Sequence, residues 1–189
     1  MISISLAQSD QELRGIIALQ TVNLPKNISA EEAESQGFVT VVHDFDILKK
    51  MNNDKSHIIA KSGDQVVGYC LAMTKKFKKD IPVLVPMFDK MDEQVYKGRL
   101  VKDYNYIVCG QVCVAKSTRG QGVFDRMYHH YQDAYSVKYN LILTEIAERN
   151  QRSIRAHYRV GFETLIRYKA ANGEDWEVVV WDWRTTKGA

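Results

Sequence analysis

The sequence predicts one α/β domain: a mixed central sheet of about six to seven strands flanked by about four helices. Three observations predict it. Short apolar runs typical of buried strands alternate with segments whose apolar residues recur at helical spacing. The 189 residues contain no repeat, low-complexity tract or obvious linker, so we treat 1–189 as a single domain. The hydrophobic fraction of 45% is ordinary for a globular chain of this length.

Charge and cysteine content exclude several classes of protein. The net charge of +3, from 26 basic and 23 acidic residues, is too small to indicate nucleic acid or a membrane surface as partner. Cys70, Cys109 and Cys113 are odd in number and lack CxxC spacing, which argues against a disulfide framework or a metal site. We expect these thiols to be buried in a reducing compartment.

The N-terminal stretch has neither a basic start nor a long apolar run, so we expect no signal peptide. No segment approaches the ~18 apolar residues of a membrane helix. We therefore expect a cytoplasmic protein. As to assembly, we expect a monomer or a homodimer.

The first elements are a strand at residues 2–6 and a helix behind it. Ser9 is followed three residues later by Glu12, the spacing of a capping box. We expect this helix to run to about Asn23 and to stop before Pro25.

A second helical region is expected over residues 30–52, with a break near Gly37. Asp44 and Asp46 suit either the first turn of a helix or the attraction of a cationic amine. After it, residues 57–60 and 66–74 read as two strands joined by a glycine-centred turn, which predicts a hairpin.

Residues 75–98 interrupt the pattern and are interpreted as an insertion with a short helix at 87–96. The run KKFKKD is basic, and the apolar stretch after it contains Pro82 and Pro86. The insertion could cover a pocket, or be a solvated charge run and a packed loop. Its lysines could favour an anionic acceptor or a ligand phosphate, although a solvated face explains them equally.

The second half continues the alternation of strands and helices. A glycine at position 161 follows the second helix as a C-cap, and Asn172-Gly173 suits a hairpin turn. The expected strands are 106–115, 141–146, 163–170 and 176–183, and the expected helices follow residue 122 and span 149–160.

The loop between residues 115 and 123 carries the clearest chemical signal. Arg119-Gly120-Gln121-Gly122 stands between a buried strand and a helix start, where backbone N–H groups and the helix dipole favour an anion such as pyrophosphate. The loop lacks the Gly-Lys-Ser/Thr ending of a P-loop, and Arg126 stands where GxGxxG needs its last glycine.

Two motifs resemble the GNAT acyltransferase superfamily from about Val66 to Phe162. The strand Val112–Val114 followed by the Arg119 to Gly122 loop is similar to its Q/R-x-x-G-x-G/A motif, although Phe124 replaces the final small residue. About thirty residues later, the segment 150–162 resembles the pattern N-x-x-S-x-x-x-H-x-x-x-G-F.

The resemblance implies an acetyl-CoA-dependent N-acetyltransferase with splayed central strands. Gly110 is a plausible site for the bulge that such a strand carries. In that family the central strand holds the pantetheine arm and the acetyl group, and the glycine loop binds the pyrophosphate. The residues expected to bind the cofactor are Val112, Cys113, Val114, Arg119, Gly120, Gln121, Gly122, Val123, Phe124, Asn150 and Ser153.

Acetyl transfer also needs a base, an oxyanion donor and an acid. The N–H of Val114 is the expected oxyanion donor. Glu145 resembles a general base at its position, or is a structural carboxylate. The family's tyrosine acid corresponds to His157, with Tyr158 beside it; since successive helix side chains point about 100° apart, only one can face the thiol.

The acceptor is expected to be the primary amine of a small molecule. The alternatives are a protein N-terminus or lysine, which would require an open groove, and a non-catalytic acyl-CoA-binding module. Thiol release from acetyl-CoA separates the enzymatic hypotheses from the third.

Overall fold

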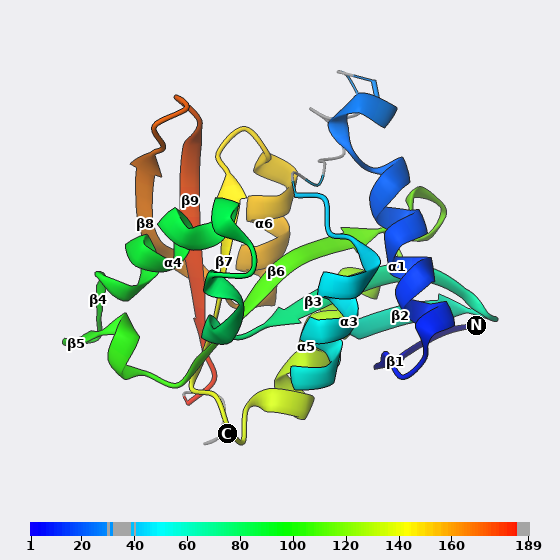
Figure 1. Cartoon of the computed structure of the whole chain (residues 1–189), viewed down its shortest axis with the longest axis horizontal. Coiled ribbons are helices and arrows are strands. Elements are labelled where there is room, and N and C mark those ends of the chain that lie inside the picture. The colour runs from blue at the N-terminus through cyan, green and yellow to red at the C-terminus, as the bar shows by residue number, and fades with distance from the viewer. Residues whose placement is uncertain (30, 32–38, 40, 185–189) are drawn as a thin grey trace.

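The computed structural model describes residues 1–29, 31, 39 and 41–184. It forms a seven-stranded mixed sheet of order β1-β2-β3-β6-β7-β9-β8 with helices on both faces (Figure 1). The strands of this sheet are β1 Ile2–Leu6, β2 Ile58–Ser62, β3 Gln65–Met73, β6 Tyr106–Val114, β7 Leu141–Ala147, β8 Glu163–Lys169 and β9 Asp175–Asp182. The described α-helices are α1 Asp10–Val22, α3 Phe45–Asp54, α4 Val85–Asp92, α5 Val123–Tyr135 and α6 Gln151–Val160.

Two apolar clusters cover the two faces of the sheet. One contains buried residues of α1, α3 and α4, including Leu48 and Phe88, against alternate residues of β3, β6 and β7. The other contains buried residues of α5 and α6, including Tyr131 and Ile154, against the opposite residues of the same strands. This two-faced core is what the alternation of strands and helices predicted.

The first expected elements are confirmed by their local contacts. The Ser9 hydroxyl accepts from the Glu12 N–H at 3.2 Å, and the Glu12 carboxylate accepts from the Ser9 N–H at 3.1 Å, so the capping box is present. Asp44 caps α3 by accepting from the Ile47 N–H at 2.9 Å, which supports its reading as a helix-start residue. The hairpin of β2 and β3 is also present. Most of the expected helical stretch before Asp44, and the break at Gly37, lie outside the described residues.

The insertion differs from expectation at both ends of its helix. Helix α4 begins at Val85 because Pro86 lies in its first turn, where a missing N–H removes no helical bond. It ends at Asp92 rather than residue 96, and a small hairpin follows, formed by β4 Val95–Tyr96 and β5 Arg99–Leu100. The turn between these two strands has Lys97 and Gly98 at φ of 46° and 79°.

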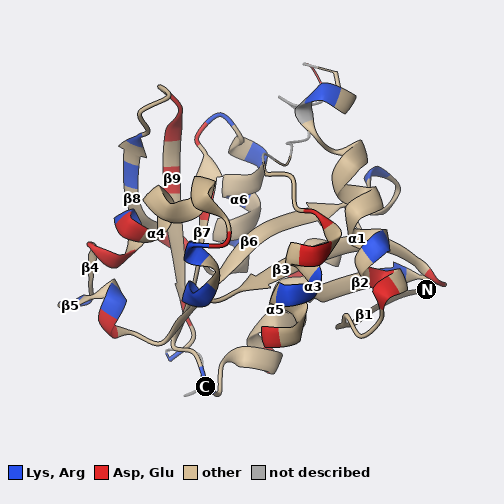
Figure 2. Ribbon diagram, in the orientation of Figure 1, with Lys and Arg blue, Asp and Glu red and all other residues tan. Residues whose placement is uncertain are grey.

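Three of the four lysines of KKFKKD pair with neighbouring acids. Figure 2 colours the lysines of this segment blue and the acidic residues around it red. Lys75 pairs with Asp92 at 3.0 Å and Lys76 pairs with Asp54 at 2.6 Å, while Phe77, which follows them, is buried. The insertion covers the face of the sheet that carries α1 and α3.

The central strands separate as the resemblance implied. Strands β6 and β7 run parallel but pair only from Tyr106 with Leu141 to Val108 with Leu143. Where the pairing stops, the Thr144 hydroxyl donates to the Cys109 carbonyl at 2.8 Å. The register of β6 against β3 shifts between residues 109 and 112, which confirms an irregularity at Gly110. Beyond it, β6 and β7 are no longer paired.

All three cysteines are buried and free. Among the described residues, no helix is both long and apolar enough to cross a membrane. Within the same part of the chain, no group of three or more His, Cys, Asp or Glu side chains is placed to hold a metal ion.

Candidate active site

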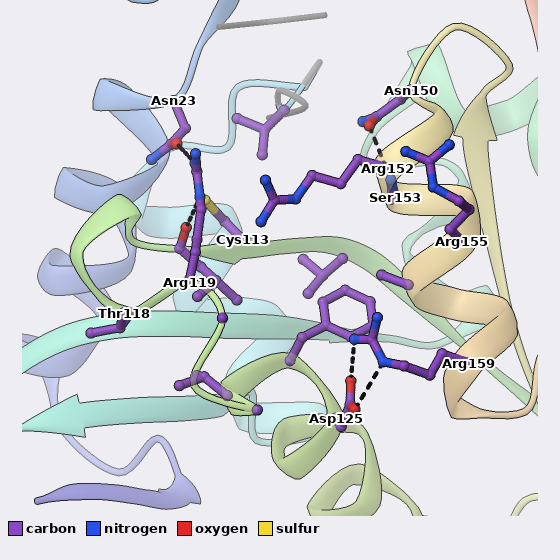
Figure 3. Close-up of a pocket in the computed structure, with 18 residues that line it drawn as sticks. Asn23, Cys113, Thr118, Arg119, Asp125, Asn150, Arg152, Ser153, Arg155 and Arg159 are labelled. Atoms are coloured by element: carbon purple, nitrogen blue, oxygen red, sulfur yellow. Dashed lines mark hydrogen bonds and ion pairs between the residues drawn. The ribbon is translucent and has the colours of Figure 1, made fainter. Parts of the chain in front are cut away.

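A cavity of about 530 Å³ lies at the opening between β6 and α6 (Figure 3). Its walls come from the last residues of β6, the glycine loop, the first turn of α5 and one face of α6. Of the expected cofactor-binding residues, all but Gln121 line it. The Gln121 side chain instead donates to the Ser117 carbonyl at 3.1 Å and is exposed.

The backbone of β6 presents polar groups to the opening. The Ala115 N–H donates to the Val67 carbonyl of β3, and Val114 lies opposite Gly68. In an antiparallel ladder, this makes Val114 a non-hydrogen-bonded partner of β3, so its N–H and C=O point the other way. Val112, two residues earlier, has the same orientation. Because β7 has already diverged, these groups face the cavity instead of a neighbouring strand.

The glycine loop has the conformation of an anion site. Gly120 and Gly122 have φ of 78° and 70°, a region that residues with a Cβ avoid. Gly122 is the N-cap of α5 and supplies no side chain to the helix start. The N–H groups of the first turn have no acceptor inside a helix, and they carry the positive end of its dipole. An anion in the cavity would therefore meet backbone donors at this end.

Arg119 connects the loop to two other parts of the site. Its Nε donates to the Val114 carbonyl at 3.1 Å, and its Nη2 donates to Asn23 Oδ1 at 3.0 Å. The guanidinium thus ties the loop to the end of β6 and to the residue that ends α1. This arrangement holds the loop in place as one wall of the cavity.

Three arginines of α6 also line the cavity. Arg152, Arg155 and Arg159 recur at i, i+3 and i+7, which places them on one helix face. Arg159 pairs with Asp125, in the first turn of α5, through two contacts of 2.6 and 3.1 Å. The sequence alone did not identify these arginines as part of the site. Their helical spacing is visible in the sequence, but only the packing of α6 turns this helix face toward the cavity.

Asn150 and Ser153 form the start of α6. The Asn150 side chain accepts from the Ser153 N–H at 3.3 Å and so caps the helix. Asn150 is buried and both residues line the cavity. The motif asparagine therefore has a structural role here whatever it binds.

His157 is buried in the core behind Phe124 and does not line the cavity. Its Nδ1 lies 2.8 Å from the Ser153 carbonyl, which can only accept, so this nitrogen carries the proton. Its Nε2 then accepts from the Tyr128 hydroxyl at 2.7 Å. Burial lowers the pKa of His157 to about 4, so the ring is neutral at pH 7.

Tyr158 points away from the cavity toward β8 and β9. Its hydroxyl bonds to the Thr164 hydroxyl at 2.7 Å and to the Glu177 carboxylate. Neither member of the expected acid pair is thus placed beside the cavity.

Glu145 lies on β7, where the strand continues past the end of its pairing with β6. Every second residue of a strand points to the same face, so the Glu145 side chain lies on the face of Leu141 and Leu143, which α1, α3 and α4 cover. Burial raises the pKa of Glu145 to about 7, and a hydrogen bond from the Tyr168 hydroxyl opposes this shift. A carboxyl with this pKa exchanges protons readily near neutrality.

Comparisons with known proteins agree with this geometry. The profile of the Acetyltransferase (GNAT) family matches residues 9–162. No curated protein sequence matches the chain. The ribosomal-protein-S18-alanine N-acetyltransferase from Escherichia coli is similar in fold, with a TM-score of 0.60 and 11% identity over 96% of this chain and 94% of that one.

Two other similar structures contain the cofactor expected from the motifs, or its CoA product. The putative acetyltransferase yncA from Salmonella typhimurium, solved with acetyl-CoA, has a TM-score of 0.61 and 13% identity, covering 97% of this chain and 94% of its own. The NatC complex bound to Gag peptide and CoA has a TM-score of 0.65 and 12% identity, covering 96% of this chain and 98% of its own. Because the family profile spans most of the sequence, the chain belongs to the GNAT acetyltransferase family.

Proposed function

We propose that this protein binds acetyl-CoA in the cavity and transfers the acetyl group to the primary amine of a small molecule. One observation carries the proposal. The cavity joins the glycine loop at the start of α5 to the part of β6 that has lost its pairing with β7. A carboxyl of raised pKa, Glu145, lies on the other face of the sheet.

The cavity suits the parts of the cofactor in order. The pyrophosphate would accept from the N–H groups of residues 120–124 at the start of α5. The pantetheine arm would lie along Val112 and Val114, whose outward backbone groups replace the missing strand neighbour. The thioester carbonyl would then reach the N–H of Val114, a donor for the oxyanion that forms when the amine attacks.

Glu145 is the proposed base. A free alkyl ammonium has a pKa near ~10.4, so it must lose a proton before it attacks. A carboxylate whose pKa is about 7 takes that proton, directly or through water, better than one of ordinary pKa. Its position on the opposite face of β7 would let the amine and the cofactor approach the opening from different sides.

His157 is proposed to position the site rather than to donate a proton. Both ring nitrogens have partners inside the core, and the ring packs edge-on against Phe124 with 5.0 Å between centroids. Its contacts therefore fix the first turns of α5 relative to α6. Replacing His157 by Ala would disturb the cavity wall, while Tyr158→Phe would leave it intact.

A small acceptor is favoured over a protein by the insertion. Phe88 and Met91 of α4 are fully buried on the sheet face that carries Glu145, so this face is covered rather than open. One similar structure is named a ribosomal-protein-S18-alanine N-acetyltransferase and another is bound to a Gag peptide, which makes a protein N-terminus the second candidate.

A free-thiol assay with acetyl-CoA tests the proposal against amines and N-terminal or lysine peptides. We expect thiol release above hydrolysis with a small amine and little with peptides. Release only with peptides would contradict the small acceptor. CoA binding without release for any acceptor, and no effect of Glu145→Gln, would indicate a binding module instead.

A further inference from the structure

The carboxyl group of Glu145 is held at one of its two oxygens. Among the residues that the structure describes, its hydrogen-bond partner is the hydroxyl of Tyr168, which donates to Oε1. A carboxylate can accept about four hydrogen bonds, so this contact leaves Oε2 open to a further donor. Glu145 is half-buried rather than fully enclosed, which allows such a donor to approach.

A bulge in β8 determines which face of the sheet Tyr168 occupies. Strand β8 is at the edge of the sheet, and β9 lies between it and β7 (Figure 1). Thr164 of β8 is opposite Val179, whereas Ile166 is opposite Val178, so one extra residue has entered β8 between them. Successive side chains of a strand point to opposite faces, and an extra residue reverses this alternation. Tyr168, two residues after Ile166, therefore shares the face of Val178.

Glu145 of β7 points to the same face, because it is also opposite Val178 in the pairing of β7 with β9. Two strand spacings, about 10 Å, separate β7 from β8, and the tyrosine ring crosses this distance above β9. The ring packs against the apolar cluster that contains Leu143. Without the extra residue, Tyr168 would face α6 and could not reach the carboxyl group. Bulges that redirect a side chain are over-represented next to active sites.

The surroundings of Glu145 make Tyr168 its main electrostatic partner. Burial raises the pKa of Glu145 to about 7, and the hydrogen bond from Tyr168 opposes this shift. Val178 and Trp176, the facing residues of β9, do not titrate. Other titratable groups on this side of the sheet pair with one another: Tyr106 and Lys75 with Asp92, Lys78 with Asp89, Tyr96 with Glu163, and Lys97 and Arg184 with Asp182.

We propose that Tyr168 is a positioning residue for acetyl transfer: its hydroxyl holds Oε1 of Glu145 so that Oε2 takes the proton of the acceptor amine. This inference rests on the proposed function, in which Glu145 is the base. An N–H bond of the ammonium group breaks and an O–H bond forms at Oε2, which leaves the nitrogen lone pair free to attack the thioester carbon. Burial and the bond to Glu145 raise the pKa of Tyr168, so its hydroxyl remains a donor while Glu145 ionises.

The pH profile of thiol release by Tyr168→Phe tests this role. A hydrogen bond donated to a carboxylate favours its ionised form, so losing the hydroxyl should raise the pKa of Glu145. We expect a shift of about one unit, since Tyr168 is half-exposed and water can replace part of the bond. Turnover relative to the unaltered protein should be about fivefold lower at pH 7 and nearly equal at pH 9. Comparing the two proteins at each pH cancels the ionisation of the amine itself.

A direct titration of Glu145 measures the same shift without turnover. In protein labelled with ¹³C-glutamate, the carboxyl signal that is absent from Glu145→Gln reports on this residue, and its midpoint should be about one unit higher in Tyr168→Phe. Tyr96→Phe is the matched control. It removes a hydroxyl that donates at 2.6 Å to Glu163, another carboxylate of β8, and should leave the Glu145 midpoint unchanged.

Three results would overturn the inference. Equal Glu145 midpoints in the unaltered protein and Tyr168→Phe would do so while leaving the proposed function intact. The same applies to a variant slowed by one constant factor at every pH, which is what a purely structural role predicts. Absence of thiol release from the unaltered protein with every amine, despite CoA binding, would overturn the proposed function and the role of Tyr168 with it.

Discussion

Replacing Glu145 by Gln should separate catalysis from stability. The substitution keeps a side-chain oxygen that can accept from the Tyr168 hydroxyl, as the carboxylate does now. It removes the charge that β7 holds in a largely buried place. If Glu145 is the base, turnover should be lost while the folded protein becomes more stable at neutral and alkaline pH.

The magnitude follows from the pKa of Glu145. Burial raises it from an ordinary value of 4.5 to about 7. Folding therefore gains stability from the neutral carboxyl below pH ~4.5, and this gain is lost as the pH rises to ~7. A shift of this size corresponds to about 3 kcal/mol. Glu145→Gln should thus match the unaltered protein at pH 4 and exceed it by up to about 3 kcal/mol at pH 8.

Urea unfolding at pH 4, 6 and 8 measures the stability difference, and thiol release with a reactive amine measures turnover. Loss of a general base should lower turnover by about 10²- to 10⁴-fold. The acid limb of the turnover profile of the unaltered protein, midpoint near 7, should disappear in the variant. A control, Glu148→Gln, removes a charge just after the end of β7, where Glu148 pairs with Arg167 at 3.7 Å.

The reasoning would be refuted by two results. A variant that is less stable than the unaltered protein at pH 8 would show that the charged carboxylate stabilises the fold. A variant that turns over at the original rate would show that Glu145 is structural and that another group, or water, accepts the proton.

Two further predictions concern the loop and the buried histidines. Gly122→Ala adds a Cβ at φ of 70°, so it should lower the free energy of unfolding by about 1–2 kcal/mol and weaken CoA binding in calorimetry. The control Gly63→Ala, at φ of 59° in the β2–β3 turn, should lower stability as much and leave the affinity for CoA unchanged. Equal losses of affinity in the two variants would contradict the loop's role. Burial lowers the pKa of His43, His57 and His157 to about 4. Their contribution to stability should therefore be full above pH 6.5 and be lost as the pH drops toward 4, and these three losses should exceed the opposite contribution of Glu145. A melting temperature that stays constant over this pH range would contradict the prediction.

Features decided by neighbouring residues were predictable from the sequence. The capping box of Ser9 and Glu12 needs only four residues, and both partners are where the spacing put them. The glycines at 120 and 122 have the positive φ that a tight loop before a helix requires. The motif residues around them were located in the cavity for the same reason, since one strand, loop and helix carry most of them.

Features decided by packing between distant segments were not predictable. The spacing of Arg152, Arg155 and Arg159 defines a helix face, but only the docking of α6 turns it to the cavity. The ring of His157 is enclosed by residues of α5, thirty positions away in sequence. Strands as short as β4 and β5 leave no alternation to detect, and their pairing depends on a turn at Lys97.

Amide hydrogen exchange followed residue by residue by NMR, with and without CoA, tests most directly whether the cofactor lies between β6 and β7. The account predicts that CoA slows exchange at the N–H groups of Val112, Val114 and residues 120–124, with little change in β4, β5 or the β2–β3 turn. Unchanged exchange at Val112, Val114 and the glycine loop under saturating CoA, or protection confined to other elements, would contradict it.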